Sequence, residues 1–303
     1  MKKKILIIAG EPNSINSEII YKIWKKTHNN IKKRICLIGS YNLLNKQFKK
    51  LNYKIKLQQV SNIFEKTKRN ELSIYNINLK FKNPFNVPLK ESTKYVINSL
   101  NYGHKLACNK NVKGIINCPI NKRALKESKK IGVTEFLAEK NMIKDNSEVM
   151  LIYNKKVSVS PITTHIDIKK VSNKIKKKLI VKKIKNLNIY FNKIFKKKLR
   201  VAILGLNPHN GELEKNSIEV KEIIPAISKL KKNGVNIKGP FVSDTIFIDN
   251  YKNFDVVIGM YHDQVLTPFK PLFRYDAINI TLGLKYIRLS PDHGPAFDMM
   301  GKN

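Results

Sequence analysis

Three apolar runs of this chain each end close to a histidine, and this recurrence constrains the fold most. The runs span residues 157–163, 199–204 and 256–260, and the histidines that follow them are His165, His209 and His262. Short apolar runs are typical of buried strands, and ligands of an open parallel sheet collect beyond the carboxyl ends of its strands. A single histidine there is typically a hydrogen-bonded loop residue. Three of the six histidines in this position instead predict one divalent-metal site assembled by folding.

Strand and helix patterns alternate along the chain, which predicts an α/β protein with a largely parallel sheet. Strands are expected at residues 4–9, 34–38 and 114–118, a strand pair within 149–159, and helices over 17–26, 41–50 and 90–110. Ser17 is expected to cap the first of these helices. Residues 167–195 are expected to form one helix that packs on the sheet and exposes a lysine-rich face. Residues 52–90 stay ambiguous, because Pro84 and Pro88 interrupt short apolar pieces.

The length and the apolar runs bound the class of protein. A chain of 303 residues can bury a large core and suggests two domains. It has no stretch of about 18 apolar residues that would span a membrane, and the first apolar run is too short for a secretory signal. Cys36, Cys108 and Cys118 are odd in number and lack CxxC spacing, so we expect buried, reduced thiols in a cytoplasmic protein.

The formal charge of +37 raises the hypothesis of a nucleic-acid partner. Only six of the 59 basic residues are arginine, whereas nucleic-acid surfaces typically mix arginine with aromatic residues. The charge therefore favours a solvated lysine surface with no specific nucleic-acid partner. The remote alternative, a basic nucleic-acid-binding protein, predicts RNA affinity that survives about 200 mM salt and does not depend on metal.

Residues near the histidines favour a small anionic substrate. Asp167 and Asp263 follow His165 and His262 closely, and each is a candidate for orienting an imidazole ring, although Asp167 is an equally good helix cap. Further along lie side chains whose charges and amides suit a phosphate and a carboxylate, namely Lys270, Arg274, Arg288, Asn279 and Thr281. Arg288 is the most informative of them, because arginine is rare in this chain and its neighbours are apolar.

A series of motifs extends this pattern over nearly the whole chain. They are Gly10-Glu11-Pro12, Gly132-Val133-Thr134-Glu135-Phe136-Leu137, Thr163-Thr164-His165, Gly205-Leu206-Asn207-Pro208-His209-Asn210-Gly211-Glu212, Gly239-Pro240, Asp244-Thr245, Met260-Tyr261-His262-Asp263-Gln264, Asn279-Ile280-Thr281-Leu282-Gly283-Leu284, Ile287-Arg288 and Asp292-His293-Gly294. In these residues the chain resembles the 4-hydroxythreonine-4-phosphate dehydrogenase family of pyridoxal phosphate biosynthesis, from Ile5 to Asn303 and most weakly between about 40 and 90.

The resemblance implies an isocitrate/isopropylmalate dehydrogenase-like fold, with two α/β domains and a cleft between them. Residues 1–122 with about 281–303 are expected to form the first domain. Residues from about 123 to 280 are expected to form the second, which would carry the histidines and a dimer interface. This fold uses no dinucleotide glycine fingerprint, and the sequence contains none.

The resemblance also assigns roles to single residues. It implies that His165, His209 and His262 bind one divalent metal, Zn, Mg or Co, with His262 reaching across the interface of a homodimer. The implied substrate contacts are Thr134, Lys270, Asn279 and Arg288. The implied contacts to NAD or NADP lie in the last motif and its continuation, at His293, Gly294 and Asp298.

The implied reaction is an NAD-dependent, metal-assisted oxidation of 4-phosphohydroxy-L-threonine. Decarboxylation of the β-keto acid would then give 3-amino-2-oxopropyl phosphate. Lys122, Asp244 and Asp263 are the candidates for proton transfer, and the sequence does not rank them.

Three departures from the family pattern bear on this reaction. Val133 stands where the family has a substrate-binding histidine, and valine cannot donate a hydrogen bond. Val133 therefore favours an alternative function, that of a sister dehydrogenase acting on another phosphorylated hydroxy acid such as a phospho-threonate. The turn Asn13-Ser14-Ile15-Asn16 lacks two glycines of the family. The chain ends at Asn303, where relatives continue with a C-terminal helix. Either this helix is expected to be dispensable here, or the sequence is a shortened product with weakened cofactor binding or stability.

Overall fold

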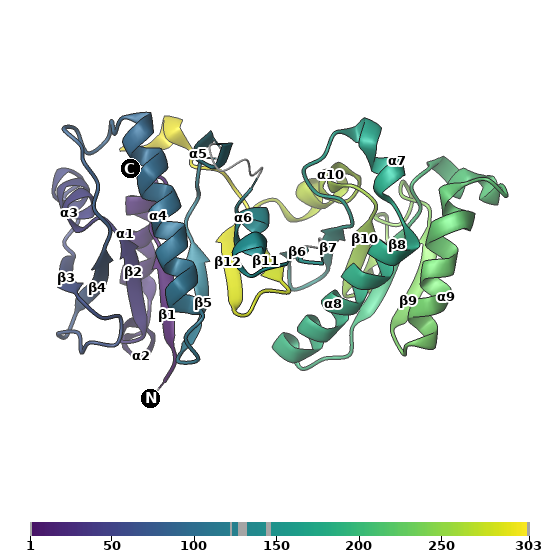
Figure 1. Ribbon diagram of the computed structural model, residues 1–303, viewed down its shortest axis with the longest axis horizontal. Helices are drawn as coiled ribbons and strands as arrows, with labels where there is room; N and C mark the ends of the chain where they lie inside the picture. The colour runs from purple at the N-terminus through teal and green to yellow at the C-terminus, as the bar shows by residue number, and fades with distance from the viewer. Residues whose placement is uncertain (1, 122, 127–131, 144–146, 302–303) are drawn as a thin grey trace. The chain divides into compact units, whose positions relative to one another are not determined.

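A computed structural model describes residues 2–121, 123–126, 132–143 and 147–301 (Figure 1). Contacts divide the chain into unit 1, Met1–Lys140 with Lys285–Asn303, and unit 2, Asn141–Leu284. The border expected after residue 122 lies ahead of helices α5 (Arg123–Lys126) and α6 (Val133–Lys140), which this division places in unit 1.

Unit 1 is built on a parallel sheet. In hydrogen-bonded order its strands are β3 (Lys56–Val60), β4 (Glu71–Asn76), β2 (Ile35–Gly39), β1 (Lys4–Ile8), β5 (Val112–Asn117) and β12 (Ile287–Pro291). The two central strands, β1 and β2, read Lys-Ile-Leu-Ile-Ile and Ile-Cys-Leu-Ile-Gly, the continuous apolar runs that a sheet covered on both faces requires. Strands β3 and β4 lie within the stretch that the sequence left ambiguous.

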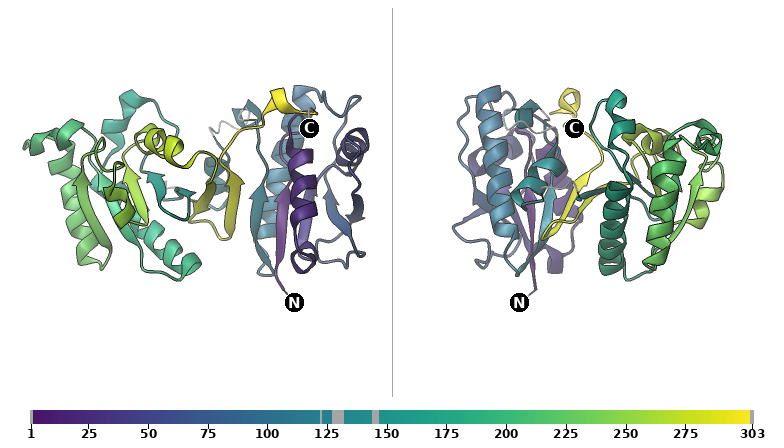
Figure 2. Two further views of the ribbon diagram at one scale, coloured as in Figure 1. Left: turned by 180° about the vertical axis from the view of Figure 1, so that it is seen from behind. Right: turned by 45° about the vertical axis from the view of Figure 1, so that its right-hand side comes forward.

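Helices cover both faces of this sheet (Figures 1 and 2). Helices α1 (Asn16–Lys26) and α3 (Tyr41–Lys50) lie on one face, where Trp24 and Phe48 pack with Ile7 and Leu37 of the strands. Helix α4 (Leu89–Ala107) lies on the other face, so close that a Cβ on its Gly103 would meet Ile8 Cδ1 at 2.5 Å. The short helices of unit 1 are α2 (Asn29–Lys32), α5, α6 and η5 (Phe297–Met299).

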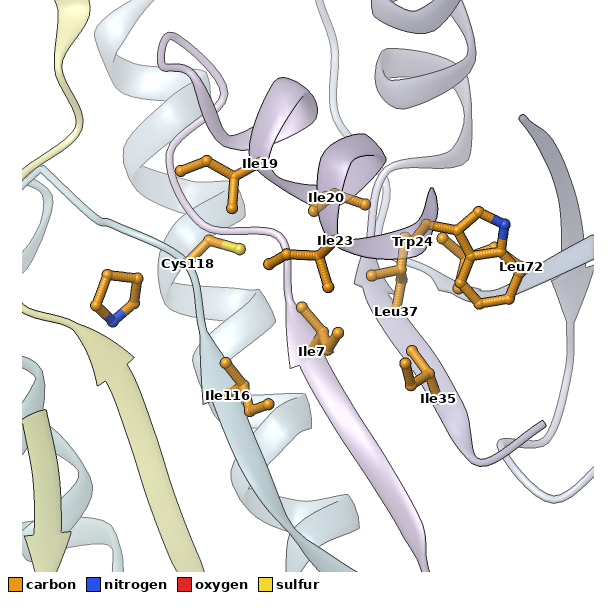
Figure 3. Close-up of a pocket in the computed structure, with 11 residues that line it drawn as sticks. Ile7, Ile19, Ile20, Ile23, Trp24, Ile35, Leu37, Leu72, Ile116 and Cys118 are labelled. Atoms are coloured by element: carbon orange, nitrogen blue, oxygen red, sulfur yellow. The ribbon is translucent and has the colours of Figure 1, made fainter. Parts of the chain in front are cut away.

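The α1 face holds a partly open apolar pocket of about 80 Å³ (Figure 3). Isoleucines of α1, among them Ile19 and Ile20, and Trp24 line it from the helix, while Ile7 and Ile116 line it from the strands. The thiol of Cys118 is also at this pocket, and burial raises the pKa of that thiol to about 12. Because these walls offer almost no hydrogen-bond partners, binding of water in the pocket is unfavourable.

Unit 2 is built on a mixed sheet. Its order is β11 (Ile278–Leu282), β6 (Val149–Tyr153), β7 (Ser158–Pro161), β10 (Val256–Gly259), β8 (Arg200–Leu204) and β9 (Asn236–Phe241). Strands β7, β10, β8 and β9 run parallel, whereas β6 pairs antiparallel with β11 and β7. The strand pair expected within 149–159 is confirmed as β6 and β7.

Helices α8 (Lys177–Phe195) and α9 (Ile224–Lys232) lie on one face of this sheet, and α10 (His262–Phe273) lies on the other (Figures 1 and 2). Phe269 and Phe273 of α10 pack with Val159 and Val257 of the strands. The remaining helical turns are η1 (Ile168–Lys170), α7 (Val171–Lys174), η2 (Pro208–Leu213), η3 (Glu219–Ile223) and η4 (Asn250–Asn253).

The single helix expected over residues 167–195 is wrong. The segment contains η1 and α7, which are contiguous, and then α8, because Ile175 and Lys176 adopt extended backbone between α7 and α8. Asp167 caps the first piece by accepting a hydrogen bond from the Lys169 amide at 2.9 Å. Of the two roles considered for Asp167, the structure therefore shows the helix cap.

Two further expectations are corrected. Helix α1 begins at Asn16, one residue before Ser17, and Ile15 precedes it without a side-chain cap, so Ser17 is buried inside the first turn. Cys36 and Cys118 are buried as expected, but Cys108 is exposed at the end of α4. Across the described part of the chain, no helix combines the length and the hydropathy needed to cross a membrane.

Candidate functional site

The three histidine-bearing strand ends of unit 2 are neighbours. Strand β10 pairs in parallel with β7 on one side and β8 on the other, so their carboxyl ends reach the same edge of the sheet. His165 follows β7, His262 opens α10 after β10, and His209 lies in η2 after β8. The topology thus delivers all three segments to the edge where ligands of parallel sheets bind.

Two of the histidines lie against each other. The ring centroids of His165 and His262 are 5.4 Å apart, with an angle of 42° between the rings. Two imidazoles on one tetrahedral ion, with metal–nitrogen distances of about 2.0–2.1 Å, have ring centres roughly 5 Å apart. The pair therefore fits a shared divalent ion.

Asp263 orients the ring of His262. The Nδ1 atom of His262 and Oδ1 of Asp263 are 2.7 Å apart. A carboxylate that accepts from Nδ1 fixes the tautomer in which Nε2 carries the lone pair, as in many metal-binding histidines. Asp263 is thus seen in the ring-orienting role, and its side chain is otherwise exposed.

His209 lies on a loop with unusual backbone. His209, Asn210, Gly211, Glu212 and Leu213 all have left-handed φ values between 46° and 58°. Each non-glycine residue in this conformation costs about 1 kcal/mol or more, so the surrounding structure must hold the loop. Among the described residues of one chain, no three His, Cys, Asp or Glu side chains form a complete metal-binding group. The structure therefore joins His165 and His262, but not His209, into one cluster.

The candidates for proton transfer differ in position. Asp244 is exposed just after β9, in unit 2. Asp263 contacts His262 as described. Lys122 lies outside the described residues.

The substrate candidates of unit 2 lie on adjacent elements. Lys270 is half-buried on the last turns of α10, and Asn279 is half-buried on β11. The Oδ1 atom of Asn279 is buried, and no hydrogen-bond donor reaches it among the described residues. An unsatisfied buried acceptor is rare in folded proteins, and a bound ligand is one way to satisfy it.

The substrate candidates of unit 1 include a buried arginine. Arg288 is 3% exposed on β12, and its Nε donates to Asn117 Oδ1 at 2.6 Å. Burial lowers the pKa of this guanidinium to about 10, and the nearby Glu135 acts in the opposite direction. The group thus remains cationic at neutral pH in an environment where an anionic oxygen would be strongly bound. Thr134 is buried in α6, and Val133 begins the same helix.

The predicted cofactor residues occupy the segment after β12. His293, Gly294 and Asp298 are exposed. The segment contacts α1 and the residue before it, because the Ile15 amide donates to Pro295 O and the Gly301 amide donates to Glu18 Oε1. No atom lies within 4 Å of the position that a Cβ would take on Gly294. Open space beside an unstrained glycine leaves room for a ligand to approach the backbone.

Comparison with known proteins identifies the family of this chain. A model of the family described as "Pyridoxal phosphate biosynthetic protein PdxA" matches residues 31–303. The chain belongs to this family. It is 40% identical over 310 residues to a 4-hydroxythreonine-4-phosphate dehydrogenase from Aquifex aeolicus, covering 100% of this chain and 93% of that protein. It is also 34% identical over 195 residues to a D-threonate 4-phosphate dehydrogenase from Pectobacterium atrosepticum, covering 62% of this chain and 58% of that protein.

A solved structure supports the PdxA fold. The crystal structure of a 4-hydroxythreonine-4-phosphate dehydrogenase from Klebsiella pneumoniae superposes with a TM-score of 0.84 at 28% identity, covering 100% of this chain and 94% of that one. The α/β fold class predicted from the sequence is therefore confirmed for this PdxA chain.

Two residues with a part in this site were not among the predicted ones. Glu219 is fully buried, and its Oε1 accepts from the amides of Leu206 and Asn207 at 2.7 and 2.8 Å. Burial alone would raise the pKa of Glu219, but these hydrogen bonds outweigh it and hold the pKa below its usual value. Gln264 forms hydrogen bonds at three strand ends. The sequence offered a signal only for Gln264, which closes one of the PdxA-like motifs.

Proposed function

We propose that this PdxA-family protein oxidises 4-phosphohydroxy-L-threonine with NAD, or with NADP, as the hydride acceptor. The oxidised β-keto acid then loses carbon dioxide to give 3-amino-2-oxopropyl phosphate, in the synthesis of pyridoxal 5'-phosphate. The observation that carries the proposal is that the segments with His165, His209 and His262 follow three neighbouring parallel strands, in a chain whose relatives include 4-hydroxythreonine-4-phosphate dehydrogenases.

The proposed metal ligands are His165, His209 and His262. A divalent ion held there, Zn, Mg or Co, supplies Lewis-acid polarisation of the substrate hydroxyl. Asp263 supports this role, because its hydrogen bond to His262 Nδ1 fixes the ring orientation. Because the resemblance implies that His262 reaches across a subunit interface, we propose a homodimer in which each metal site combines His165 and His209 of one subunit with His262 of the partner subunit.

The proposed substrate contacts are Thr134, Lys270, Asn279 and Arg288. The buried guanidinium of Arg288 suits a carboxylate or phosphate oxygen, and the buried Oδ1 of Asn279 suits a donor such as an ammonium or hydroxyl group. His293, Gly294 and Asp298 are the proposed contacts to the nicotinamide cofactor, in a segment with room beside its backbone.

The proton and the hydride leave the same carbinol. A base accepts the hydroxyl proton while the carbon-bound hydrogen leaves with its electron pair to the nicotinamide. Cleavage of the bond to the carboxylate then releases carbon dioxide, and a proton replaces it on carbon. Lys122, Asp244 and Asp263 are the proposed candidates for proton transfer, and we propose that the enzyme acts in the cytoplasm.

The experiment supplies the purified full-length protein with substrate, NAD and Zn²⁺, Mg²⁺ or Co²⁺ after chelation. The expected result is metal-dependent formation of reduced nicotinamide together with stoichiometric release of carbon dioxide. A folded dimer that produces neither with any of the three ions would contradict the proposal.

A second candidate substrate is D-threonate 4-phosphate or a similar phosphorylated hydroxy acid. Val133 favours it, because this position cannot donate the hydrogen bond of the family's histidine, and the Pectobacterium relative carries that activity in its name. The two substrates differ where one has an amine and the other a hydroxyl. Comparing kcat/KM for both separates the candidates, and a preference for the threonate would replace the first proposal with the second.

A further inference from the structure

We propose that Gln264 is a positioning residue that fixes the strand end carrying His209 relative to the strand end carrying His262. The inference rests on the proposed function, because that function makes both histidines metal ligands. Gln264 is half-buried in the first turn of α10, two residues after His262.

The side-chain amide of Gln264 reaches three separate strand ends of unit 2. Its Oε1 accepts from the Met260 amide after β10 at 2.6 Å. Its Nε2 donates to Gly205 O after β8 at 2.7 Å and to Ser243 Oγ after β9 at 2.8 Å. Gly205 and Ser243 lead into the segments with His209 and Asp244, so one side chain connects three segments that carry candidate site residues.

The β8 loop needs such support. The run of left-handed residues from His209 to Leu213 is unfavourable by itself, and it persists only if its base is fixed. Gln264 holds Gly205 O, while Glu219 holds the amides of Leu206 and Asn207. The Gly205 amide donates to Phe241 O at 3.1 Å. The polar backbone groups at the start of the loop are thus bound from different sides.

Packing around Gln264 also restricts its conformation. A Cβ on Gly259 would lie 3.0 Å from Gln264 Oε1 and 2.6 Å from Val265 Cγ1. Glycine at position 259 therefore allows the side chain to lie against the end of β10. A side chain confined in this way keeps the loops that it bonds at fixed relative positions, whereas a mobile side chain would not.

The test compares two glutamines, Gln264 and Gln47, whose side-chain amides each connect separate backbone segments. Gln264→Met removes the three hydrogen bonds and keeps the approximate length of the side chain. Gln47→Met is the matched control, because Gln47 is 2% exposed in unit 1 and its Nε2 donates to two loop carbonyls, Pro12 O and Pro84 O. Both variants of the full-length protein are titrated with Co²⁺, whose absorption spectrum reports the coordination geometry, and with Zn²⁺.

We expect Gln264→Met to weaken Co²⁺ binding about 10- to 100-fold and to change the spectrum, in the range typical of residues that orient metal ligands. Gln47→Met should lose stability but keep the affinity and the spectrum. Ser243→Ala, which removes only the bond to the β9 loop, should change Co²⁺ affinity by less than about threefold, and it serves as the mild variant if Gln264→Met does not fold.

The outcomes separate the two proposals. Wild-type affinity and spectrum in Gln264→Met would overturn the positioning role and leave the proposed function intact. An equal loss of affinity in Gln264→Met and Gln47→Met would overturn it as well, because the effect would then be one of general stability. If Gln264→Met does not fold, a Ser243→Ala affinity that falls tenfold or more would overturn the assignment of the effect to the β8–β10 link. A wild-type dimer that binds neither ion would overturn the metal site of the proposed function together with this inference.

Discussion

Two turns that follow strands of this protein are held by similar side-chain hydrogen bonds, but they differ in what they can do. In unit 1, the turn after β1 is held by Asn16, whose Nδ2 donates to Ala9 O, Glu11 O and Pro119 O at 2.9, 3.2 and 2.9 Å. In unit 2, the turn after β8 is held by Gln264 and Glu219. In each case a side-chain amide donates to a carbonyl oxygen that is distant in sequence, Pro119 O for Asn16 and Gly205 O for Gln264.

The two turns differ in what occupies their interior. The Asn16 amide fills the turn after β1, and a Cβ on Gly10 would lie 2.7 Å from it and 2.6 Å from Pro119 O. The turn after β8 is supported at its base, and His209 follows beyond the supported residues. The first arrangement closes the turn around Asn16, whereas the second is followed by a side chain that can bind a metal. Mutations in the two turns should therefore affect different measurements.

The largest effect is expected from loss of a proposed metal ligand. His262→Gln should lower kcat/KM about 10³-fold, roughly 4 kcal/mol, because Lewis-acid stabilisation is worth several kcal/mol. The midpoint of thermal unfolding should change little. Steady-state kinetics with saturating metal measures the effect, and His28→Gln, an exposed histidine of unit 1, is the control. Full activity in His262→Gln would remove His262 from the proposed metal ligands.

Replacement of Arg288 tests whether unit 1 contributes to substrate binding, although Asn16 fills its turn after β1. Arg288→Lys keeps the positive charge and loses the planar fork, so kcat/KM should fall roughly 100-fold, about 3 kcal/mol, mainly through KM. Arg34→Lys is the control, since Arg34 is more exposed than Arg288 and its Nε donates to Lys3 O. An unchanged KM would restrict substrate recognition to residues of unit 2.

Asn16 tests the structural side of the comparison. Asn16→Ala should lower the free energy of unfolding by about 2 kcal/mol, because three carbonyl oxygens lose a buried donor. Urea denaturation followed by the fluorescence of Trp24 measures this loss, and Co²⁺ affinity should stay at the wild-type value. Weakened Co²⁺ binding in this variant would mean that the two turns are not independent.

Replacement of Asp255 tests the stability of the amino ends of β8 and β10 in unit 2, which lie opposite the ends that lead to the histidines. Burial alone would raise its pKa, but hydrogen bonds from Arg200 and Lys197 outweigh it and hold the pKa below the usual range. Asp255→Asn should therefore cost about 1.5 kcal/mol at pH 7, a value that allows for the exposed partners. A depressed carboxyl pKa stabilises the fold above the unfolded value of about 3.9 and loses that contribution as pH falls through the folded value.

The pH dependence supplies the check for Asp255. The difference in unfolding free energy between wild type and Asp255→Asn should be constant between about pH 5 and 8 and should shrink below about pH 4. Metal affinity should not change. A difference that grows on acidification would contradict the assigned direction of the pKa shift.

The smallest effect is expected at Gly294. Gly294→Ala meets no neighbouring atom in the protein, so the midpoint of unfolding should stay within experimental error. If the cofactor approaches this backbone, KM for NAD should rise about fivefold, close to 1 kcal/mol, while KM for the phosphorylated substrate stays constant. Equal KM values for NAD in both proteins would remove Gly294 from the cofactor contacts.

The sequence predicted features that depend on local pattern and missed those that depend on long-range contacts. Apolar runs located the strands that precede His165, His209 and His262, because a buried strand can be recognised from its own consecutive apolar residues. The break at Ile175 and Lys176 was missed, since neither residue interrupts the apolar spacing that predicted one helix.

The supporting residues of the site show the same limit. Glu219 lies far along the chain from the β10 histidine, and nothing in its neighbours distinguishes it from a surface carboxylate. Only the fold reveals that it is fully buried against two backbone amides. Ser17 was predicted as a cap because its residue type suits that position, but Asn16 already binds the strand ends and starts the helix one residue earlier.

The apolar pocket under α1 gives unit 1 a characteristic response to compression. The pocket volume of about 80 Å³ per molecule amounts to roughly 50 mL per mole, which is within the range of volume lost when proteins unfold under pressure. Hydrostatic pressure should therefore loosen the α1 side of that sheet by driving water between Trp24 and the strands. Replacing a lining residue by a bulkier one would make the protein less compressible.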